Sequence, residues 1–240
     1  IDVGKTINIL KAQIGSLVDY ITKIKEIIKP GCPLVAIPTT AGSGSELTPW
    51  ATVWDDINKK KYSLHLPDLW AEWAICDPRT QLSLPVDVTI QSGLDALSHA
   101  IESVWNINSN PISTNYARIA SDLIFEFLPA LIKKPSDIQL RSKIQFAAVN
   151  AGLAFSNTRT SMAHAISYYL TLHKGTPHGI ACSVPLPLLL DFIEKNEYEM
   201  AQILHKTFSV DLHNKLKGLL QKCNISSNLE DYSLDKSDFR

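Results

Sequence analysis

Residues 87–105, DVTIQSGLDALSHAIESVW, determine how the larger part of this chain folds. Apolar side chains recur along this stretch at spacings of three and four, at Ile90, Leu94, Leu97, Ile101 and Val104. This period is typical of a helix with one buried face. We therefore predict a long helix that has Asp87 as its N-cap and ends near Trp105.

The helical period continues beyond this stretch, and shorter apolar runs precede it. Further helices are expected over residues 111–133, 137–155, 161–172, 178–192, 199–208 and 211–221, with a polar, loosely held tail from residue 224. Upstream, we expect a helix over 1–10 and strands over 34–38, 51–55, 61–65 and 73–77, because turn residues bound these short runs. The sequence thus predicts an α/β part, residues 1–84, followed by an all-helical domain, residues 85–240.

Composition and charge exclude several classes of protein. The 240 residues are 45% hydrophobic, and 23 basic residues nearly balance 24 acidic ones. The resulting net charge of −1 provides no overall attraction for nucleic acid or an anionic membrane, so neither partner is expected. Apolar runs are all shorter than the roughly 18 residues of a membrane span. Four widely separated cysteines predict reduced thiols in a cytoplasmic protein rather than a disulfide framework or a zinc knuckle.

Four residues of the helical part carry side chains that bind divalent metal ions. Asp95 and His99 stand four apart, so they project from the same face of the predicted helix, and His178 follows His164 by fourteen residues. A carboxylate and imidazoles suit Fe²⁺ or Zn²⁺. Spacing alone also allows a surface hydrogen-bonded pair for Asp95 and His99, a core histidine at 164 and a helix start at 178.

A loop of small and hydroxyl residues follows the first predicted strand. Residues 38–46 read PTTAGSGSE, and such a loop lets the backbone approach a phosphate or ribose and offers N–H and O–H donors. It lacks the G-x-G-x-x-G pattern, so composition leaves a nucleotide-binding loop and a simple tight loop equally open.

Taken together, these motifs resemble the iron-containing, or group III, alcohol dehydrogenase family. Residues 38–48 (PTTAGSGSELT) are similar to its cofactor loop and residues 93–102 (GLDALSHAIE) to its first metal motif. His164 with residues 176–179 (TPHG) is similar to its second metal motif. The resemblance extends from residue 1 to about residue 192. It implies part of a dinucleotide-binding α/β domain, incomplete at its N-terminal side, followed by a helical metal-binding domain.

The resemblance also implies ligands and a reaction. The metal, Fe²⁺ with Zn²⁺ as the alternative, would be held by Asp95, His99, His164 and His178. NAD or NADP would be contacted by Asp2, Thr39, Thr40, Ser43 and Lys61. Asp2 and Lys5 look like the end of the family's glycine-rich pyrophosphate motif, whose glycines do not occur in this sequence. The family's reaction is hydride transfer between the nicotinamide and a small aldehyde or alcohol, and a homodimer or higher homo-oligomer is expected.

Residues 155–174 are similar to the branch of this family that reduces phosphonoacetaldehyde. Arg159 could clamp a phosphonate there, or could form an ordinary surface salt bridge. Tyr168 replaces a histidine of many relatives, and either takes part in the active site or merely packs; His173 could substitute for that histidine, or could be exposed in a turn. The alternatives are a glycerol-dehydrogenase-like or dehydroquinate-synthase-like relative, and a helical metal-binding fragment without catalysis.

Overall fold

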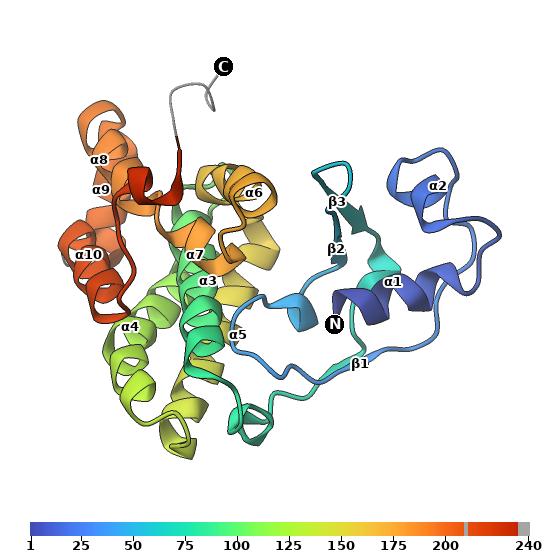
Figure 1. Ribbon diagram of the computed structural model, residues 1–240, viewed down its shortest axis with the longest axis horizontal. Coiled ribbons are helices and arrows are strands. Elements are labelled where there is room, and N and C mark those ends of the chain that lie inside the picture. The colour runs from blue at the N-terminus through green and yellow to red at the C-terminus, as the bar shows by residue number, and fades with distance from the viewer. Residues whose placement is uncertain (209–210, 235–240) are drawn as a thin grey trace.

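The computed structural model describes residues 1–208 and 211–234. The chain forms a small N-terminal α/β part followed by a mostly helical C-terminal domain, and the two lie side by side in Figure 1. This arrangement is the fold class expected from the sequence.

The N-terminal part contains two helices and two short pairs of strands. Its elements are α1 (Asp2–Leu10), α2 (Leu17–Ile21), β1 (Val35–Ala36), β2 (Trp50–Asp55), β3 (Lys60–His65) and β4 (Trp73–Ala74). β2 and β3 form an antiparallel hairpin, whereas β1 and β4 pair in parallel over two residues each. The predicted strands at 51–55 and 61–65 are therefore confirmed, but those at 34–38 and 73–77 are shorter than expected. The sequence analysis missed α2, which begins with a capping box between Ser16 and Asp19.

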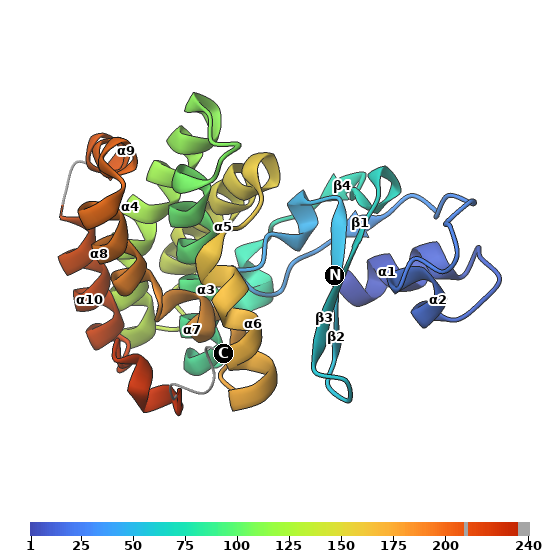
Figure 2. The same ribbon diagram turned by 90° about the horizontal axis from the view of Figure 1, so that it is seen from above.

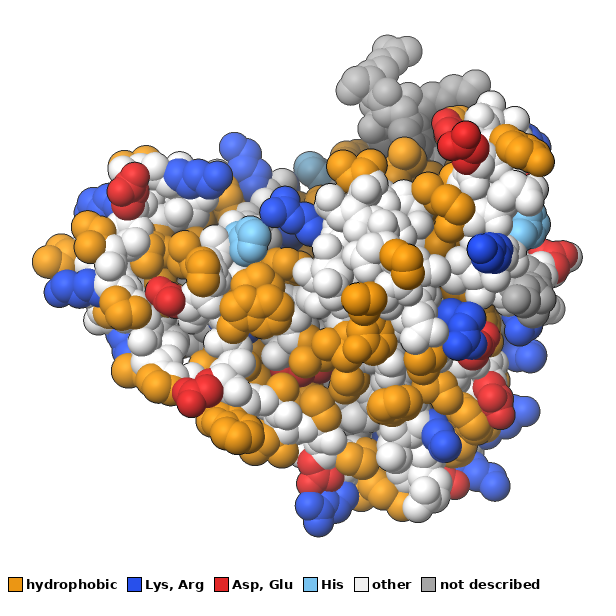
Figure 3. All heavy atoms as spheres, turned by 180° about the vertical axis from the view of Figure 1, so that it is seen from behind, with side chains coloured by type: hydrophobic (Ala, Val, Ile, Leu, Met, Phe, Trp, Pro, Cys, Tyr) orange, Lys and Arg blue, Asp and Glu red, His pale blue; other side chains and the backbone are white. Residues whose placement is uncertain are grey.

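This N-terminal part has a small core of its own. Ile9, Ala51, Leu64 and Leu69 are buried together. Many of its other apolar side chains face outward, and Ile14 is 86% exposed. Figure 3 shows such hydrophobic side chains spread over the surface of the molecule. Burial of apolar area is what stabilises a fold, so most of the stabilising core lies in the helical domain.

The helical domain is organised around its first helix. Its elements are α3 (Val86–Trp105), α4 (Pro111–Lys133), α5 (Ile138–Thr158), α6 (Met162–Lys174), α7 (His178–Ser183), α8 (Leu186–Asn196), α9 (Tyr198–Phe208) and α10 (Leu212–Lys222). α3 packs against α4, α5 and α7. Leu94, Leu97, Ile101 and Val104 are fully buried, as the period of three and four predicts.

Three details of the helical domain differ from the prediction. Pro85, not Asp87, is the N-cap of α3, and Asp87 lies in the first turn, where its charge still favours the helix N-terminus. The helix expected over 178–192 is two helices, because Pro185 has no N–H to continue the first one. The tail is not loosely held throughout, since a 3₁₀ turn at Leu229–Tyr232 packs on the core beside α6 and α7; residues 235–240 lie outside the described part.

The β2–β3 hairpin faces the helical domain. In the view of Figure 2 it stands between that domain and α1. Trp50 on β2 contacts the ring of Phe155 on α5, with ring centroids 5.6 Å apart, and Trp54 contacts His178 on α7 at 5.4 Å. These contacts place the aromatic face of the hairpin over the residues that carry the chemistry. Within the described ranges, no helix is both long enough and apolar enough to cross a membrane.

Candidate metal centre and substrate cavity

The four residues predicted to bind a metal converge in the helical domain. Oδ1 of Asp95 lies 3.8 Å from Nε2 of His99, 3.6 Å from Nε2 of His164 and 4.0 Å from Nε2 of His178. These separations exceed a hydrogen bond. Donors that each lie about 2.0–2.2 Å from one tetrahedral ion stand roughly 3.5 Å apart, which is close to the separations found here.

Two of the donor atoms have no partner in the protein. Oδ1 of Asp95 and Nε2 of His164 are buried and accept no hydrogen bond within the described residues. Buried polar atoms are nearly always paired, because leaving one unpaired costs about 1–3 kcal/mol. A divalent cation at this point would satisfy both atoms at once, so the residues present fit a metal ion.

Close helix packing brings the donors together from three helices. Asp95 and His99 are one turn apart on α3, His164 lies on α6, and His178 is the first residue of α7. Gly179 allows α7 to approach α3, since a Cβ atom at this position would lie only 1.9 Å from the carbonyl oxygen of Gln91. A larger residue at 179 would therefore push His178 away from Asp95.

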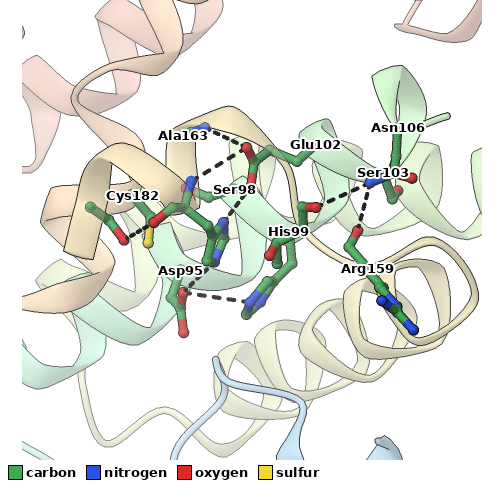
Figure 4. Close-up of polar contacts among 12 residues, drawn as sticks. Asp95, Ser98, His99, Glu102, Ser103, Asn106, Arg159, Ala163 and Cys182 are labelled. Atoms are coloured by element: carbon green, nitrogen blue, oxygen red, sulfur yellow. Dashed lines mark hydrogen bonds and ion pairs between the residues drawn. The ribbon is translucent and has the colours of Figure 1, made fainter. Parts of the chain in front are cut away.

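Glu102, one further turn along α3, orients His164. Its carboxylate accepts hydrogen bonds from the backbone N–H of Ala163 at 2.5 Å and of His164 at 3.4 Å, and it also contacts Nδ1 of His164 (Figure 4). A carboxylate at Nδ1 holds the proton there and leaves the Nε2 lone pair free. Nε2 is the atom that faces Asp95.

Electrostatics at the cluster favour a bound cation. Burial alone would raise the pKa of Asp95, but the three nearby histidines outweigh it and hold this pKa below its ordinary value. Burial is the main cause that lowers the pKa of His99 to about 4, assisted by the two other histidines and opposed by Asp95. At neutral pH, Asp95 is therefore ionised and His99 is neutral, which are the states that bind a metal. Burial would lower the pKa of His164 and His178, but Cys182 and Asp95 outweigh it and raise both pKa values, so a metal ion must displace protons from these two imidazoles.

All four donors line a cavity of about 360 Å³ between the helical domain and the hairpin. Five of the other residues singled out from the sequence line the same cavity, namely Asp2, Ser43, Lys61, Arg159 and Tyr168. Thr39 and Thr40 lie on the loop that leads to the cavity but are not among its lining residues. The structure thus brings together nine of the eleven predicted site residues.

The glycines of the loop at 38–48 have a packing role. A Cβ atom at Gly42 would lie 2.7 Å from the backbone oxygen of Ser92 on α3, and one at Gly44, where φ is +59°, would lie 2.8 Å from the Phe155 ring. These glycines therefore let the loop rest directly on α3 and α5.

The same loop is tied to α1. The buried ammonium of Lys5 donates to the carbonyl oxygens of Ser45 at 2.5 Å and Thr48 at 2.6 Å. Asp2 accepts from the backbone N–H of Thr52 at 2.8 Å and from the hydroxyl of Ser45. Lys5 and Asp2 hold the loop and the hairpin in register with each other beside the cavity.

Tyr168 and Lys61 meet at the side of the cavity formed by the hairpin. Nζ of Lys61 lies 3.4 Å from the hydroxyl oxygen of Tyr168 and 4.8 Å from the centre of its ring. Trp54 contacts the rings of both Tyr168 and His178. His173, by contrast, is exposed at the end of α6 and stacks on Tyr169, away from the lining residues.

Arg159 lines the cavity from the loop after α5. Asn106, which follows α3, donates to the carbonyl oxygen of Thr160 at 3.1 Å, and Asn108 donates to that of Thr158 at 3.3 Å. The backbone of Arg159 has φ 73° and ψ 178°, a region populated almost only by glycine. In Figure 4 its side chain lies beyond His99 as seen from Asp95, and the guanidinium points away from these two donors.

Sequence reasoning missed three residues beside the donors. Glu102 follows His99 by three positions and so shares the helix face of the first metal motif. Cys182 follows His178 by four, the same spacing that marked Asp95 and His99; its Sγ atom lies 3.6 Å from Nε2 of His178. Both spacings place the residue on the same helix face as a predicted ligand, so the sequence contained a signal for Glu102 and Cys182. The stacking of Phe155 on His99, with ring centroids 4.0 Å apart, had no signal in the sequence.

A helical domain that gathers one carboxylate and three imidazoles beside an α/β part is the architecture of a metal-dependent enzyme. The chain belongs to the Fe-containing alcohol dehydrogenase family: the sequence model of its C-terminal domain matches residues 89–240, and that of iron-containing alcohol dehydrogenase matches residues 1–78. This confirms the resemblance inferred from the motifs.

Individual relatives support the same family. The chain is 36% identical over 191 residues to an NAD-dependent methanol dehydrogenase of Bacillus methanolicus, covering 80% of this chain and 50% of the relative. It is 39% identical over 163 residues to a phosphonoacetaldehyde reductase of Streptomyces viridochromogenes, covering 68% and 41%. The crystal structure of sulfoacetaldehyde reductase from Bifidobacterium kashiwanohense, in complex with NAD⁺, superposes with a TM-score of 0.91 at 30% identity, covering 98% of this chain and 64% of that one. The chain spans about half the length of the curated relatives it matches.

Proposed function

We propose that this chain carries the metal centre and substrate cavity of a nicotinamide-dependent alcohol dehydrogenase or aldehyde reductase. The observation that supports this most directly is the convergence of Asp95, His99, His164 and His178, within 4.0 Å of one carboxylate oxygen, at a cavity lined by both parts of the chain. When bound, the ion supplies Lewis-acid polarisation of a carbonyl oxygen and the nicotinamide supplies or accepts the hydride.

The protein's own residues position the reactants. The four donors would hold Fe²⁺ or Zn²⁺, and the side chain of His178, 33% exposed, leaves one side of the cluster open to the cavity. Trp54 and Phe155 cover the cluster with apolar rings and so exclude water from it. Tyr168, held by Lys61, is the hydroxyl that we place beside the reacting oxygen of the substrate.

The nicotinamide cofactor is assigned to the hairpin side of the cavity. Asp2, Ser43 and Lys61 line it there, and the loop with Thr39 and Thr40 leads into it. The similar sulfoacetaldehyde reductase was crystallised with NAD⁺, and the methanol dehydrogenase relative is NAD-dependent by name. These names favour NAD over NADP for this chain.

For the substrate, we propose a small aldehyde that carries an anionic group, such as phosphonoacetaldehyde. Two cationic side chains, Lys61 and Arg159, line the cavity that contains the metal donors. Two of the similar proteins are named for anionic aldehydes, one a phosphonate and one a sulfonate. A guanidinium recognises such groups through paired, charge-assisted hydrogen bonds.

The backbone of Arg159 supports a functional role for this residue. A non-glycine residue in its conformation costs about 1–3 kcal/mol and persists where the surroundings enforce it, often at binding sites. Glycine would relieve the strain. We therefore expect Arg159→Gly to stabilise the fold but to weaken binding of an anionic substrate, a combination that a merely structural arginine would not produce.

The proposed function is tested first by metal content. The purified chain should retain close to one equivalent of Fe²⁺ or Zn²⁺ by mass spectrometry, and His164→Ala should retain none while keeping its helical circular dichroism. Chelation should abolish aldehyde reduction by the protein, and added metal should restore it. Aldehyde reduction that persists after complete metal removal would contradict the proposal.

The substrate class is tested with Arg159→Met, which keeps much of the stem volume but removes the charge. Loss of hydrogen bonds to a charged group costs about 1.5–3 kcal/mol, so kcat/KM for phosphonoacetaldehyde should fall about ten- to a hundredfold. An uncharged aldehyde of similar length is the matched control and should be nearly unaffected. Equal losses for both substrates would assign Arg159 a structural role, and no loss for either would remove it from the site.

The same proposal retains two further expectations from the sequence. Homo-oligomers are the commonest assemblies of soluble enzymes, so we expect at least a homodimer in solution. The four cysteines form no disulfide bond with one another. We propose a cytoplasmic location, where thiols stay reduced.

A further inference from the structure

A cationic side chain holds a tyrosine hydroxyl at the cavity. Tyr168 lies on α6 one turn after His164, so the two side chains share a helix face, and both line the cavity. The hydroxyl oxygen of Tyr168 is 3.4 Å from Nζ of Lys61 on β3, where the hairpin lies beside α6 in Figures 1 and 2. The same Nζ donates to the hydroxyl of Ser63 at 3.2 Å, and Ser63 is exposed to solvent.

The chemistry of the two groups fixes the direction of this contact. An ammonium has only donors, so Lys61 donates and the oxygen of Tyr168 accepts. The hydrogen of the Tyr168 hydroxyl can therefore point into the cavity. The separation of 3.4 Å is long, as contacts at catalytic groups often are before a substrate binds. The contact thus leaves a donor that can face a substrate oxygen.

Besides the metal donors and the pair of Lys61 and Tyr168, three titratable groups among the described residues line the cavity, and none is placed to supply a proton. Asp2 already accepts from a hydroxyl and a backbone N–H. The guanidinium of Arg159 cannot be deprotonated. The ring of His65 packs on Trp50, at the opposite end of the hairpin from Lys61.

We propose that Tyr168 is a catalytic residue that exchanges a proton with the substrate oxygen, and that Lys61 positions its hydroxyl. The inference rests on the proposed function. During reduction, the carbonyl carbon gains the hydride that the nicotinamide loses, and the π electron pair of the C=O bond passes to the oxygen. That oxygen takes the proton of the Tyr168 hydroxyl. The ammonium of Lys61 stabilises the phenolate until solvent water returns a proton to it. Oxidation of an alcohol follows the same steps in reverse.

Replacing Tyr168 by Phe tests the proton donor. Phe keeps the ring that contacts Trp54 and Lys61 and removes only the hydroxyl. General acid–base catalysis contributes about 10²–10⁴-fold, so kcat for aldehyde reduction should fall by that factor. The fall should be the same for phosphonoacetaldehyde and for propanal, because the proton goes to the carbonyl oxygen of either. Tyr169→Phe is the matched control, since Tyr169 is also on α6 but does not line the cavity, and it should keep the wild-type kcat.

Metal content and solvent isotope effects separate a lost proton donor from a disturbed site. Tyr168→Phe should retain the metal ion and the KM for NADH of the wild-type protein, and its kcat should depend more strongly on D₂O because protonation has become slow. Wild-type kcat, loss of the metal ion or an unchanged solvent isotope effect in this variant would overturn the role of Tyr168 and leave the proposed function intact. Absence of aldehyde reduction by the metal-loaded wild-type protein would overturn both.

Two substitutions of Lys61 test its positioning role. Lys61→Met removes the ammonium, and loss of a hydrogen bond from a charged group should lower kcat about ten- to a hundredfold. Lys61→Arg keeps a cationic donor and should restore most of this loss. A higher KM for NADH with unchanged kcat in Lys61→Met would make Lys61 a cofactor contact only and overturn its positioning role. Equal losses of kcat in the Met and Arg variants would overturn it as well.

Discussion

Replacing Glu102 by Gln tests whether the metal centre depends on the orientation of His164. Glu102 is fully buried, and its carboxylate holds Nδ1 of His164 while it accepts from the backbone N–H of Ala163. Gln has nearly the same shape. If its carbonyl oxygen keeps the hydrogen bond to Ala163, its NH₂ group faces Nδ1 and favours the tautomer with the proton on Nε2, which cannot bind a metal.

The expected loss in affinity follows from this change of tautomer. Loss of a carboxylate partner of a ligating histidine typically costs about 10- to 100-fold in metal affinity, which is about 1.4–2.8 kcal/mol. The stability of the metal-free protein should change less, because Gln preserves the volume and one hydrogen bond. Glu102→Ala should instead destabilise the metal-free fold by about 1–3 kcal/mol for each backbone N–H left unsatisfied.

Isothermal titration of the metal-free protein with Zn²⁺ measures the affinity, and thermal unfolding with and without Zn²⁺ measures the stability. Glu46→Gln is the matched control, since Glu46 is also buried but does not line the cavity. We expect unchanged affinity for that variant. If Glu102→Gln bound Zn²⁺ with wild-type affinity, Glu102 would not orient His164 and would only cap α6.

Two further variants test the electrostatics and the packing of the site. In metal-free protein, His99 binds a proton only below about pH 4, whereas in the unfolded chain it does so near 6.5, so the free energy of unfolding should fall as the pH falls through this window. At pH 5 the loss of free energy of unfolding amounts to about 2 kcal/mol, at about 1.36 kcal/mol per pH unit, and His99→Gln should remove this loss. Denaturant titrations at pH 7 and pH 5 measure the free energy of unfolding; the same difference between the two pH values in wild-type protein and variant would contradict the assignment. Gly179→Ala should lower the free energy of unfolding by more than ordinary overpacking does, which is about 1–3 kcal/mol, and should abolish metal retention, because its Cβ would meet the backbone of α3. Gly218 in α10 has open space around it, so Gly218→Ala should raise the free energy of unfolding by about 0.5–1 kcal/mol. Equal melting temperatures for the two alanine variants would show that α7 does not depend on close contact with α3.

The helical domain was the more predictable part of the fold. Each helix longer than ten residues carries an apolar face at helical spacing, and packing against its neighbours satisfies that pattern directly. The short elements were less predictable. β1 and β4 pair over only two residues, and α2 depends on a capping box within five residues, so neither has a periodic signal that a sequence window detects.

The candidate site was predictable where its residues share a helix. Asp95 and His99 are one turn apart, and the spacing predicted their common face. The convergence of α3, α6 and α7 was expected only from the resemblance. It depends on Gly179, which lets α7 contact the backbone at Gln91, and the sequence does not show that these two positions are neighbours. Glu102 and Cys182 also had suitable spacing, but only the structure shows that they contact His164 and His178.

The position of the cavity assigns separate tasks to the two parts of the chain. The metal donors come from α3, α6 and α7, whereas Trp54 and Lys61, which face them, come from the β2–β3 hairpin. Changes in the helices should therefore act on metal affinity, and changes in the hairpin should act on what reaches the ion. Because Trp54 contacts both His178 and Tyr168, movement of the hairpin would open the cluster to water without displacing a donor from its helix. Access and metal binding can thus vary independently in this architecture.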